Sequence, residues 1–189
     1  MKFSPMKIEG AYLIGINLLK DERGAFGRSF CHDAFLNQGL NTKISQCNIS
    51  CNNKKGTLRG MHYQRAPQEE AKLIRCIRGH LFDAFIDLRP QSPTYLKWDA
   101  IELREDSFNQ LYLPEGVAHG FLTLSDNTQV LYQMSKNYAP DYATGILWND
   151  PLFSIDWPFQ PIIISEKDTS YPHFKPCKSE SLLQEHLDL

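Results

Sequence analysis

Apolar and polar residues alternate along most of this chain, in short runs that suit strands better than helices. In the run FDAFIDL, residues 82–88, every second residue from Phe82 onward is apolar. Asp83 and Asp87 therefore belong to the opposite face. This period of two predicts a strand that is buried on one side only.

Similar runs recur at residues 43–50, 57–64, 71–77, 95–103, 110–114, 120–124 and 128–135. Residues typical of turns, such as NNKKG and RPQSP, separate them. Helical signals are few. One short helix is predicted within residues 32–40, where Asp33 suits the N-cap and Gly39 suits the end. The tail at residues 179–189 (SESLLQEHLDL) predicts an amphipathic helix.

Many short strands without intervening helices predict an all-β fold, either a sandwich, a jelly roll or a barrel. The chain has 189 residues, a length typical of one domain, and it contains no internal repeat or linker that would divide it. We therefore expect a single domain over residues 1–189, with short peripheral helices. Prolines recur from Pro158 onward, so the chain from about residue 170 is expected to form an irregular or helical tail.

Composition and charge exclude several classes of protein. Hydrophobic residues make up 42% of the chain and charged residues 22%, which is ordinary for a globular protein. A net charge of −2 predicts no nucleic-acid partner, and no apolar stretch approaches the roughly 20 residues of a membrane span. Five cysteines without a C-x-x-C pair do not suggest a disulfide framework. Since Pro5 and Glu9 also make the N-terminus a poor signal peptide, the expected location is the cytoplasm.

The first candidate site is the run LRGMHYQ, residues 58–64, with Lys72 shortly after it. It pairs a histidine, which can accept a proton near neutral pH, with an arginine, which can bind phosphate through two hydrogen bonds. Strict alternation puts Arg59 and His62 on opposite faces, so both can serve one site only if the strand bulges at Gly60. The alternative is a buried histidine that donates to a carbonyl oxygen.

The second candidate site is LYLPEGVAHGF, residues 111–121, in which a Pro-x-Gly turn precedes His119. This pattern is typical of cupins, because the turn reverses the chain at the mouth of a barrel and directs the histidine inward. Metal-binding cupins carry a partner motif with two histidines separated by one residue. Here that motif reads His62-Tyr63-Gln64, so the second imidazole is missing and we expect neither a bound metal nor another cofactor.

Three further side chains, Tyr132, Asp168 and Arg23, each have an ordinary structural interpretation when taken singly. The sequence contains no glycine-rich phosphate loop, no G-x-S-x-G elbow and no Walker motif. The residues alone therefore indicate a cupin-like β barrel with a basic, histidine-containing cavity.

Several motifs together resemble the dTDP-4-dehydrorhamnose 3,5-epimerase family over residues 8–170. In the family's order they are KDERGAF, QCNIS, GTLRGMHYQ, AKLIRCIRG, FDAFIDLRPQSPTY, LYLPEGVAHGFLTLSD, LYQMSKNYAP, GILWNDP, IDWP and SEKD. The resemblance implies a jelly-roll cupin that works without metal, usually as a homodimer, on a nucleoside-diphosphate sugar. It implies an isomerase of deoxysugar biosynthesis, of the kind that supplies dTDP-rhamnose for the O-antigen of lipopolysaccharide.

The resemblance also implies catalytic roles. His62 would remove a proton from the carbon next to the 4-keto group of the sugar, and Asp168 would fix the tautomer of this histidine. Lys72 would stabilise the enolate oxygen, because a proton beside a ketone is removed readily only where a preorganised cation meets the oxyanion. Tyr132 would deliver a proton to the opposite face of the ring, which inverts C3, C5 or both.

Eight positions fall where the family lines its substrate cleft: Arg23, Phe26, Arg28, Gln46, Asn48, Arg59, His119 and Lys167. Two cleft positions lack the family's usual glutamate, since Arg28 and Ala143 stand there instead. The nucleotide is therefore open between dTDP, CDP and GDP. The first expectation is the conversion of dTDP-4-dehydro-6-deoxyglucose to dTDP-4-dehydrorhamnose.

Two other functions fit the same fold. A nucleotide-sugar 3,4-ketoisomerase would move the carbonyl group instead of inverting a centre, and NMR of the product would reveal a shifted ketone. A non-catalytic carbohydrate-binding cupin would show no solvent exchange with any nucleotide sugar. The latter would leave the joint presence of the four catalytic candidates unexplained.

Overall fold

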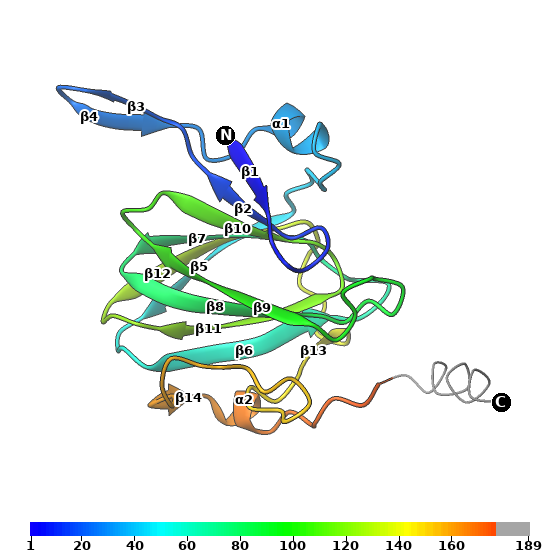
Figure 1. Cartoon of the computed structure of the whole chain (residues 1–189). Helices are drawn as coiled ribbons and strands as arrows, with labels where there is room; N and C mark the ends of the chain where they lie inside the picture. The colour runs from blue at the N-terminus through cyan, green and yellow to red at the C-terminus, as the bar shows by residue number, and fades with distance from the viewer. Residues whose placement is uncertain (177–189) are drawn as a thin grey trace.

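A computed structural model describes residues 1–176 as two largely antiparallel sheets packed face to face (Figure 1). The first sheet has the strand order β1 (Lys2–Pro5), β2 (Tyr12–Gly15), β10 (Asn109–Leu113), β7 (Lys72–Arg78), β12 (Thr128–Met134) and β5 (Gln46–Asn52). The second has the order β13 (Ala143–Gly145), β6 (Thr57–Gln64), β11 (Val117–Thr123), β8 (His80–Asp87) and β9 (Trp98–Arg104), and β14 (Ile163–Ile164) pairs with β6. This architecture confirms the predicted all-β, cupin-like jelly roll, and the eight predicted strands correspond to β5 through β12.

Two short elements outside these sheets matter for the site. Strands β3 (Leu18–Asp21) and β4 (Gly24–Gly27) form a hairpin that projects from the body of the molecule, at the upper left of Figure 1. Helix α2 (Glu166–Thr169) is a single turn that lies against β6. Neither element was predicted, because each is too short to establish a period of hydrophobic residues.

The predicted short helix is present as α1 (His32–Leu36), although Asp33 does not cap it. Cys31 occupies the N-cap without a side-chain hydrogen bond, and Asp33 lies in the first turn. Gly39 follows the helix with a φ of +71°, as its predicted place at the end requires. The predicted helix at residues 179–189 lies outside the described residues. No helix within residues 1–176 is long and apolar enough to cross a membrane.

The main hydrophobic core lies between the sheets and is formed by side chains of β7, β10 and β12 facing those of β8, β9 and β11. The outer face of the first sheet is covered by a cluster around Phe35 of α1. The outer face of the second sheet is covered by the segment after β13, including Ile146 and Phe153. Much of each sheet is therefore buried on both faces, although the edge strand β5 keeps exposed residues such as Ile49.

Strand β8 consequently lacks the exposed polar face that its alternation predicted. Ala84 and Ile86 pack in the outer cluster of the second sheet, as their apolar character requires. Asp83 and Asp87 are also fully buried, so the prediction of a strand buried on one side is wrong. The physical reason is that partners inside the fold bind both carboxylate oxygens of Asp87 and Oδ1 of Asp83, although Asp83 Oδ2 has no hydrogen-bond partner among the described residues. Alternation alone carries no information about such partners.

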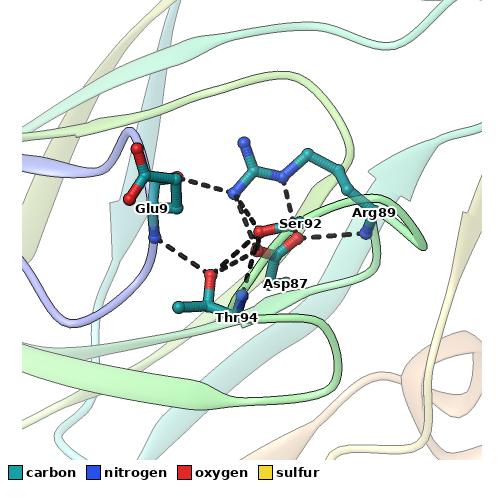
Figure 2. A network of polar contacts seen from close by, with 5 residues as sticks. All are labelled: Glu9, Asp87, Arg89, Ser92 and Thr94. Atoms are coloured by element: carbon teal, nitrogen blue, oxygen red, sulfur yellow. Dashed lines mark hydrogen bonds and ion pairs between the residues drawn. The ribbon is translucent and has the colours of Figure 1, made fainter.

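The partners of Asp87 form the network in Figure 2. Its carboxylate accepts hydrogen bonds from Arg89 Nε at 2.8 Å and from the hydroxyls of Ser92 and Thr94. Arg89 also donates to the carbonyl oxygen of Glu9 at 2.6 Å, and Glu9 N donates to Thr94 Oγ1 at 3.0 Å. Burial alone would raise the pKa of Asp87, but these hydrogen bonds lower it. The network joins the loop before β2 to the connection between β8 and β9.

Strand β6 contains the bulge that the sequence required. Its Arg59 pairs with Phe121 of β11, whereas His62 pairs with His119. Two residues of β6 therefore lie opposite Gly120 alone, and Arg59 and His62 return to the same face. Gly60 has a φ of +137°, and a Cβ added there would collide with the Cα of Gly120.

The substitution Gly60→Ala should destabilise the protein more than the substitution of a comparable glycine elsewhere. Gly24 has a similarly positive φ of +126°, but it has open space around the position of an added Cβ. Backbone strain should cost about 1–3 kcal/mol in Gly24→Ala, and overpacking should add roughly another 1–3 kcal/mol in Gly60→Ala. Urea denaturation at one protein concentration measures both free energies of unfolding. Equal losses in the two variants would show that the close approach of the strands is unimportant.

Candidate active site

A cavity of about 590 Å³ opens between the two sheets. The residues that line it come from strands of both sheets, from α2 and from segments that adjoin these elements. Eight of them are predicted site residues: Gln46 and Asn48 on β5, Lys72 on β7, Tyr132 on β12, Arg59 and His62 on β6, His119 on β11 and Lys167 on α2. The jelly roll thus gathers into one chamber side chains that lie far apart in the sequence.

His62 lines this cavity and is paired with the buried Asp168. His62 Nε2 lies 2.7 Å from Asp168 Oδ1, and Gly60 N donates to Asp168 Oδ2 at 3.3 Å. Asp168 is placed by the N-terminal turn of α2, where Ser165 Oγ accepts from the Asp168 amide. Burial would raise the pKa of Asp168, but its hydrogen bonds with His62 and Gly60 N and the charge of His62 lower it. An ionised Asp168 makes Nε2 the protonated nitrogen and leaves Nδ1 free to act as a base.

Lys72 lies on the opposite sheet and is almost fully buried. Its Nζ is 2.6 Å from Oε1 of Glu70, whose side chain is also buried. An ammonium group in a buried cavity is a strong donor toward a negatively charged oxygen, because little water screens it. The arrangement can therefore stabilise an oxyanion that forms in the cavity.

Tyr132 lies on β12, beside His119, with a distance of 5.9 Å between the ring centroids. Burial and the negative charge of Asp83 raise the pKa of Tyr132 well above its usual value, and Arg59 opposes them. His119 Nδ1 lies 2.9 Å from Asp83 Oδ1, and burial raises the pKa of Asp83 against the opposing charges of His119 and Lys72. The phenol therefore keeps its proton at neutral pH and can act as an acid.

Three predicted substrate contacts do not lie at this cavity. Arg23, Phe26 and Arg28 belong to or follow the β3–β4 hairpin, and none of them is among the described residues that line the cavity. Arg23 is bound instead to Asp21, with 2.6 Å between Nη2 and Oδ2. The hairpin projects from the barrel (Figure 1), so the structure places these three residues away from the cavity of their own chain, and their contact with substrate stays a prediction.

Several residues of the site were not predicted from the sequence, and three of them interact with predicted residues: Glu70, Asp83 and Tyr171. Glu70 precedes Lys72 by two positions, so a period of two could have placed both on one face. Asp83 was assigned to a polar, solvent-facing side. Tyr171 lies in an irregular segment without any periodic signal, and its ring centroid is 5.9 Å from that of His62.

Gln64, which stands where metal cupins carry a second histidine, is bonded to backbone groups. Its Nε2 donates to the carbonyl oxygens of Gln68 at 2.8 Å and Asn137 at 3.3 Å, while its Oε1 accepts from Ala139 N at 2.6 Å. The side chain thus holds two loops at the edge of the cavity. Within residues 1–176, no three His, Cys, Asp or Glu side chains are grouped so that they could hold a metal ion.

Comparison with known proteins agrees with this geometry. The family model of the dTDP-4-dehydrorhamnose 3,5-epimerases matches residues 5–176. A dTDP-4-dehydrorhamnose 3,5-epimerase from Methanothermobacter thermautotrophicus is 40% identical over 173 residues, which cover 90% of this chain and 92% of that protein. The crystal structure of a dTDP-4-dehydrorhamnose 3,5-epimerase from Bacillus anthracis, with TDP and PPi bound, is similar to this chain with a TM-score of 0.88 and 36% sequence identity. The match covers 92% of this chain and 99% of the Bacillus anthracis chain.

A second solved structure shows the range of these relatives. It is a 3'-monoepimerase from Streptomyces bikiniensis in complex with dTDP-quinovose, with a TM-score of 0.84 and 29% sequence identity to this chain. The match covers 97% of this chain and 96% of the Streptomyces bikiniensis chain. The matches place the chain among the isomerases of cupin type. It belongs to the dTDP-4-dehydrorhamnose 3,5-epimerase family, as its motifs predicted.

The contribution of Asp168 to stability should depend on pH. Because its pKa is lowered in the folded protein, the contribution is complete above the ordinary aspartate value of about 4 and is lost as the pH falls through the lower folded-state value. The free energy of unfolding of the wild type should therefore exceed that of Asp168→Asn at neutral pH, and the difference should shrink below about pH 4. Urea denaturation across this range measures it. A difference that grows on acidification would contradict the assignment.

Proposed function

We propose that this protein inverts C3, C5 or both in a nucleoside-diphosphate 4-keto-6-deoxyhexose. The observation that carries the proposal is the placement of a His–Asp pair and a phenol on opposite walls of one cavity, since His62 comes from the second sheet and Tyr132 from the first. Inversion needs a base on one face of the sugar ring and an acid on the other. A ketoisomerase or a simple binding protein does not require this opposition.

The first step is the removal of a proton. His62 Nδ1 accepts the proton from the carbon next to the 4-keto group, and the electron pair of the broken C–H bond moves to the ketone oxygen. Asp168 stabilises the imidazolium that forms, because it is hydrogen-bonded to Nε2. Lys72 donates to the enolate oxygen and so lowers the barrier.

The second step returns a proton to the opposite face. Tyr132 donates its phenolic proton to the same carbon, the enolate collapses to the ketone and the centre is inverted. The phenolate is short-lived because burial disfavours its charge. Exchange with water then removes the proton from His62 and restores the phenol, so the reaction is a net isomerisation.

Basic groups at the cavity suit the diphosphate of the substrate. Arg59, whose Nε is held by Asn52 Oδ1 at 2.8 Å, offers its remaining guanidinium donors, and Lys167 supplies a second cation at the mouth. Ala143, which replaces the family's usual glutamate, lines the cavity and leaves room there. We propose dTDP-4-dehydro-6-deoxyglucose as the first substrate to test, with the CDP and GDP sugars beside it.

We also propose that the protein works in the cytoplasm. The described cysteines Cys31, Cys47, Cys51 and Cys76 are all free, which supports a reducing compartment. Burial raises the pKa of Cys76 to about 11, so this thiol is protonated and unreactive at neutral pH.

The wild-type protein should exchange H3, H5 or both with solvent in D₂O, when dTDP-, CDP- and GDP-4-keto-6-deoxy sugars are screened by NMR. His62→Ala should lower the exchange rate by about 10²–10⁴-fold, since a positioned general base contributes that much. The product should keep its ketone at C4 and show changed ring couplings. A mutant rate within about threefold of the wild type would remove His62 from this role.

We further propose that the protein is a homodimer in which the β3–β4 hairpin reaches the cavity of the partner subunit. Leu19 and Phe26 are paired across the hairpin, and they are 72% and 74% exposed in the single chain. Such apolar exposure on a projecting hairpin is typical of an interface. A second copy would cover it and could bring Arg23, Phe26 and Arg28 to the substrate.

Co-expression of two inactive variants tests this arrangement. A dimer of one His62→Ala subunit and one Arg23→Ala subunit would contain one site with both residues intact, if the hairpin serves the partner. Random pairing makes half of the dimers mixed, so activity should return to about a quarter of the wild-type value. Each variant expressed alone is the control. A co-expressed sample no more active than its parents would contradict the exchange of hairpins.

A further inference from the structure

Glu70 and Lys72 are held on the same side of the chain at the beginning of β7. The residue between them, Ala71, is fixed on both sides by Ser135. Ala71 N donates to Ser135 Oγ at 2.8 Å, and Ser135 N donates to the carbonyl oxygen of Ala71 at 3.0 Å. With the intervening backbone fixed, the two flanking side chains meet inside the cavity, with 2.6 Å between Lys72 Nζ and Glu70 Oε1.

The Glu70–Lys72 ion pair is not expected to stabilise the fold. The side chains of Glu70 and Lys72 are only 5% and 4% exposed, so both charges have lost their hydration. The second carboxylate oxygen, Glu70 Oε2, is buried and has no hydrogen-bond partner among the described residues. An unpaired buried acceptor costs about 1–3 kcal/mol, and buried ion pairs are often no better than apolar residues of the same size. A cost of this kind beside a reactive group calls for a functional explanation.

We propose that Glu70 is a positioning residue for Lys72, keeping the ammonium group charged and directed at the position of the enolate oxygen. This inference rests on the proposed function, in which Lys72 meets that oxygen. Glu70 touches neither the reacting carbon nor the base, and it acts only through Lys72. A dedicated carboxylate is useful here because burial in the cavity removes the water that would otherwise hydrate the ammonium group.

The surroundings of Lys72 explain why Glu70 is needed. Asp83 from β8 acts on Lys72 through its charge. The other charged or titratable groups that line the cavity are Arg59, His62 and Tyr63 from β6, His119 from β11, Tyr132 from β12, Lys136 and Tyr138 beyond β12, Lys167 from α2 and Tyr171 after it. Arg59 and Lys136 repel an ammonium group. Oδ1 of Asp83 pairs with His119, while Asp83 Oδ2, like Glu70 Oε2, is buried without a hydrogen-bond partner among the described residues. Glu70 is the only carboxylate within 4 Å of Lys72 Nζ among the described residues.

The test is the pH dependence of kcat in Glu70→Gln, which keeps the shape of the side chain and an acceptor for Lys72 but removes the charge. We expect kcat to fall roughly 10–100-fold, less than when a direct oxyanion donor is deleted, with KM within about threefold of the wild type. The alkaline limb of the profile should move to lower pH by about one unit, because a nearby opposite charge has that effect on a cation. A purely structural role would not move this limb.

Two further variants complete the design. Glu69→Gln makes the same change of charge one position away, at a side chain outside the cavity, and should leave kcat and the limb unchanged. Glu70→Asp restores a carboxylate at shorter reach, so it should return the limb toward the wild-type position while kcat stays reduced. If Glu70→Gln does not fold, Glu70→Asp decides alone, and a wild-type kcat in that variant would overturn the proposal.

The possible failures are distinguishable. A wild-type protein that exchanges no proton with any nucleotide sugar would overturn the proposed function as a whole. A wild-type protein that exchanges protons, combined with an unmoved alkaline limb in Glu70→Gln, would overturn only the role of Glu70.

Discussion

The close approach of β6 and β11 at Gly60 and Gly120 is the constraint on which the site depends. Without the bulge, alternation along β6 would turn either Arg59 or His62 away from the cavity. The same bulge presents the backbone N–H of Gly60 to Asp168, so one local irregularity directs His62 into the cavity and helps to fix its partner Asp168. Only glycine at position 60 allows the two backbones to lie so close together.

The jelly roll adds a second property, which is the opposition of its two sheets. One sheet carries His62 and the other carries Lys72 and Tyr132. The groups with different proposed roles therefore lie on facing sheets that enclose a cavity of about 590 Å³. Packing of the two sheets against each other buries many of the polar side chains between them. Burial then strengthens the electrostatic interactions in the cavity and keeps the phenol of Tyr132 protonated. It also raises the free-energy cost of a carboxylate that lacks a partner.

Much of this could be predicted from the sequence, and the exceptions have physical causes. Period-two runs located β5 through β12, and the spacing of Arg59 and His62 required a bulge if both side chains were to serve one site. Alternation predicted the wrong environment for Asp83. A pattern of polarity shows which residues share a face, but not whether that face meets a buried partner such as His119. The hairpin that carries Phe26 was assigned to the cleft by resemblance, and its actual direction depends on chain geometry that periodicity does not encode.

The proposed mechanism requires that proton removal and proton return occur on opposite faces of the sugar ring and use different residues. Tyr132→Phe separates the two steps, because the variant keeps the ring and loses only the hydroxyl. The mechanism predicts that this variant still exchanges substrate protons with D₂O through His62, at a rate within about threefold of the wild type, while formation of inverted product falls by about 10²–10⁴-fold. If exchange and inversion fall by the same factor, Tyr132 is not the acid that returns the proton, and the two-face account is wrong.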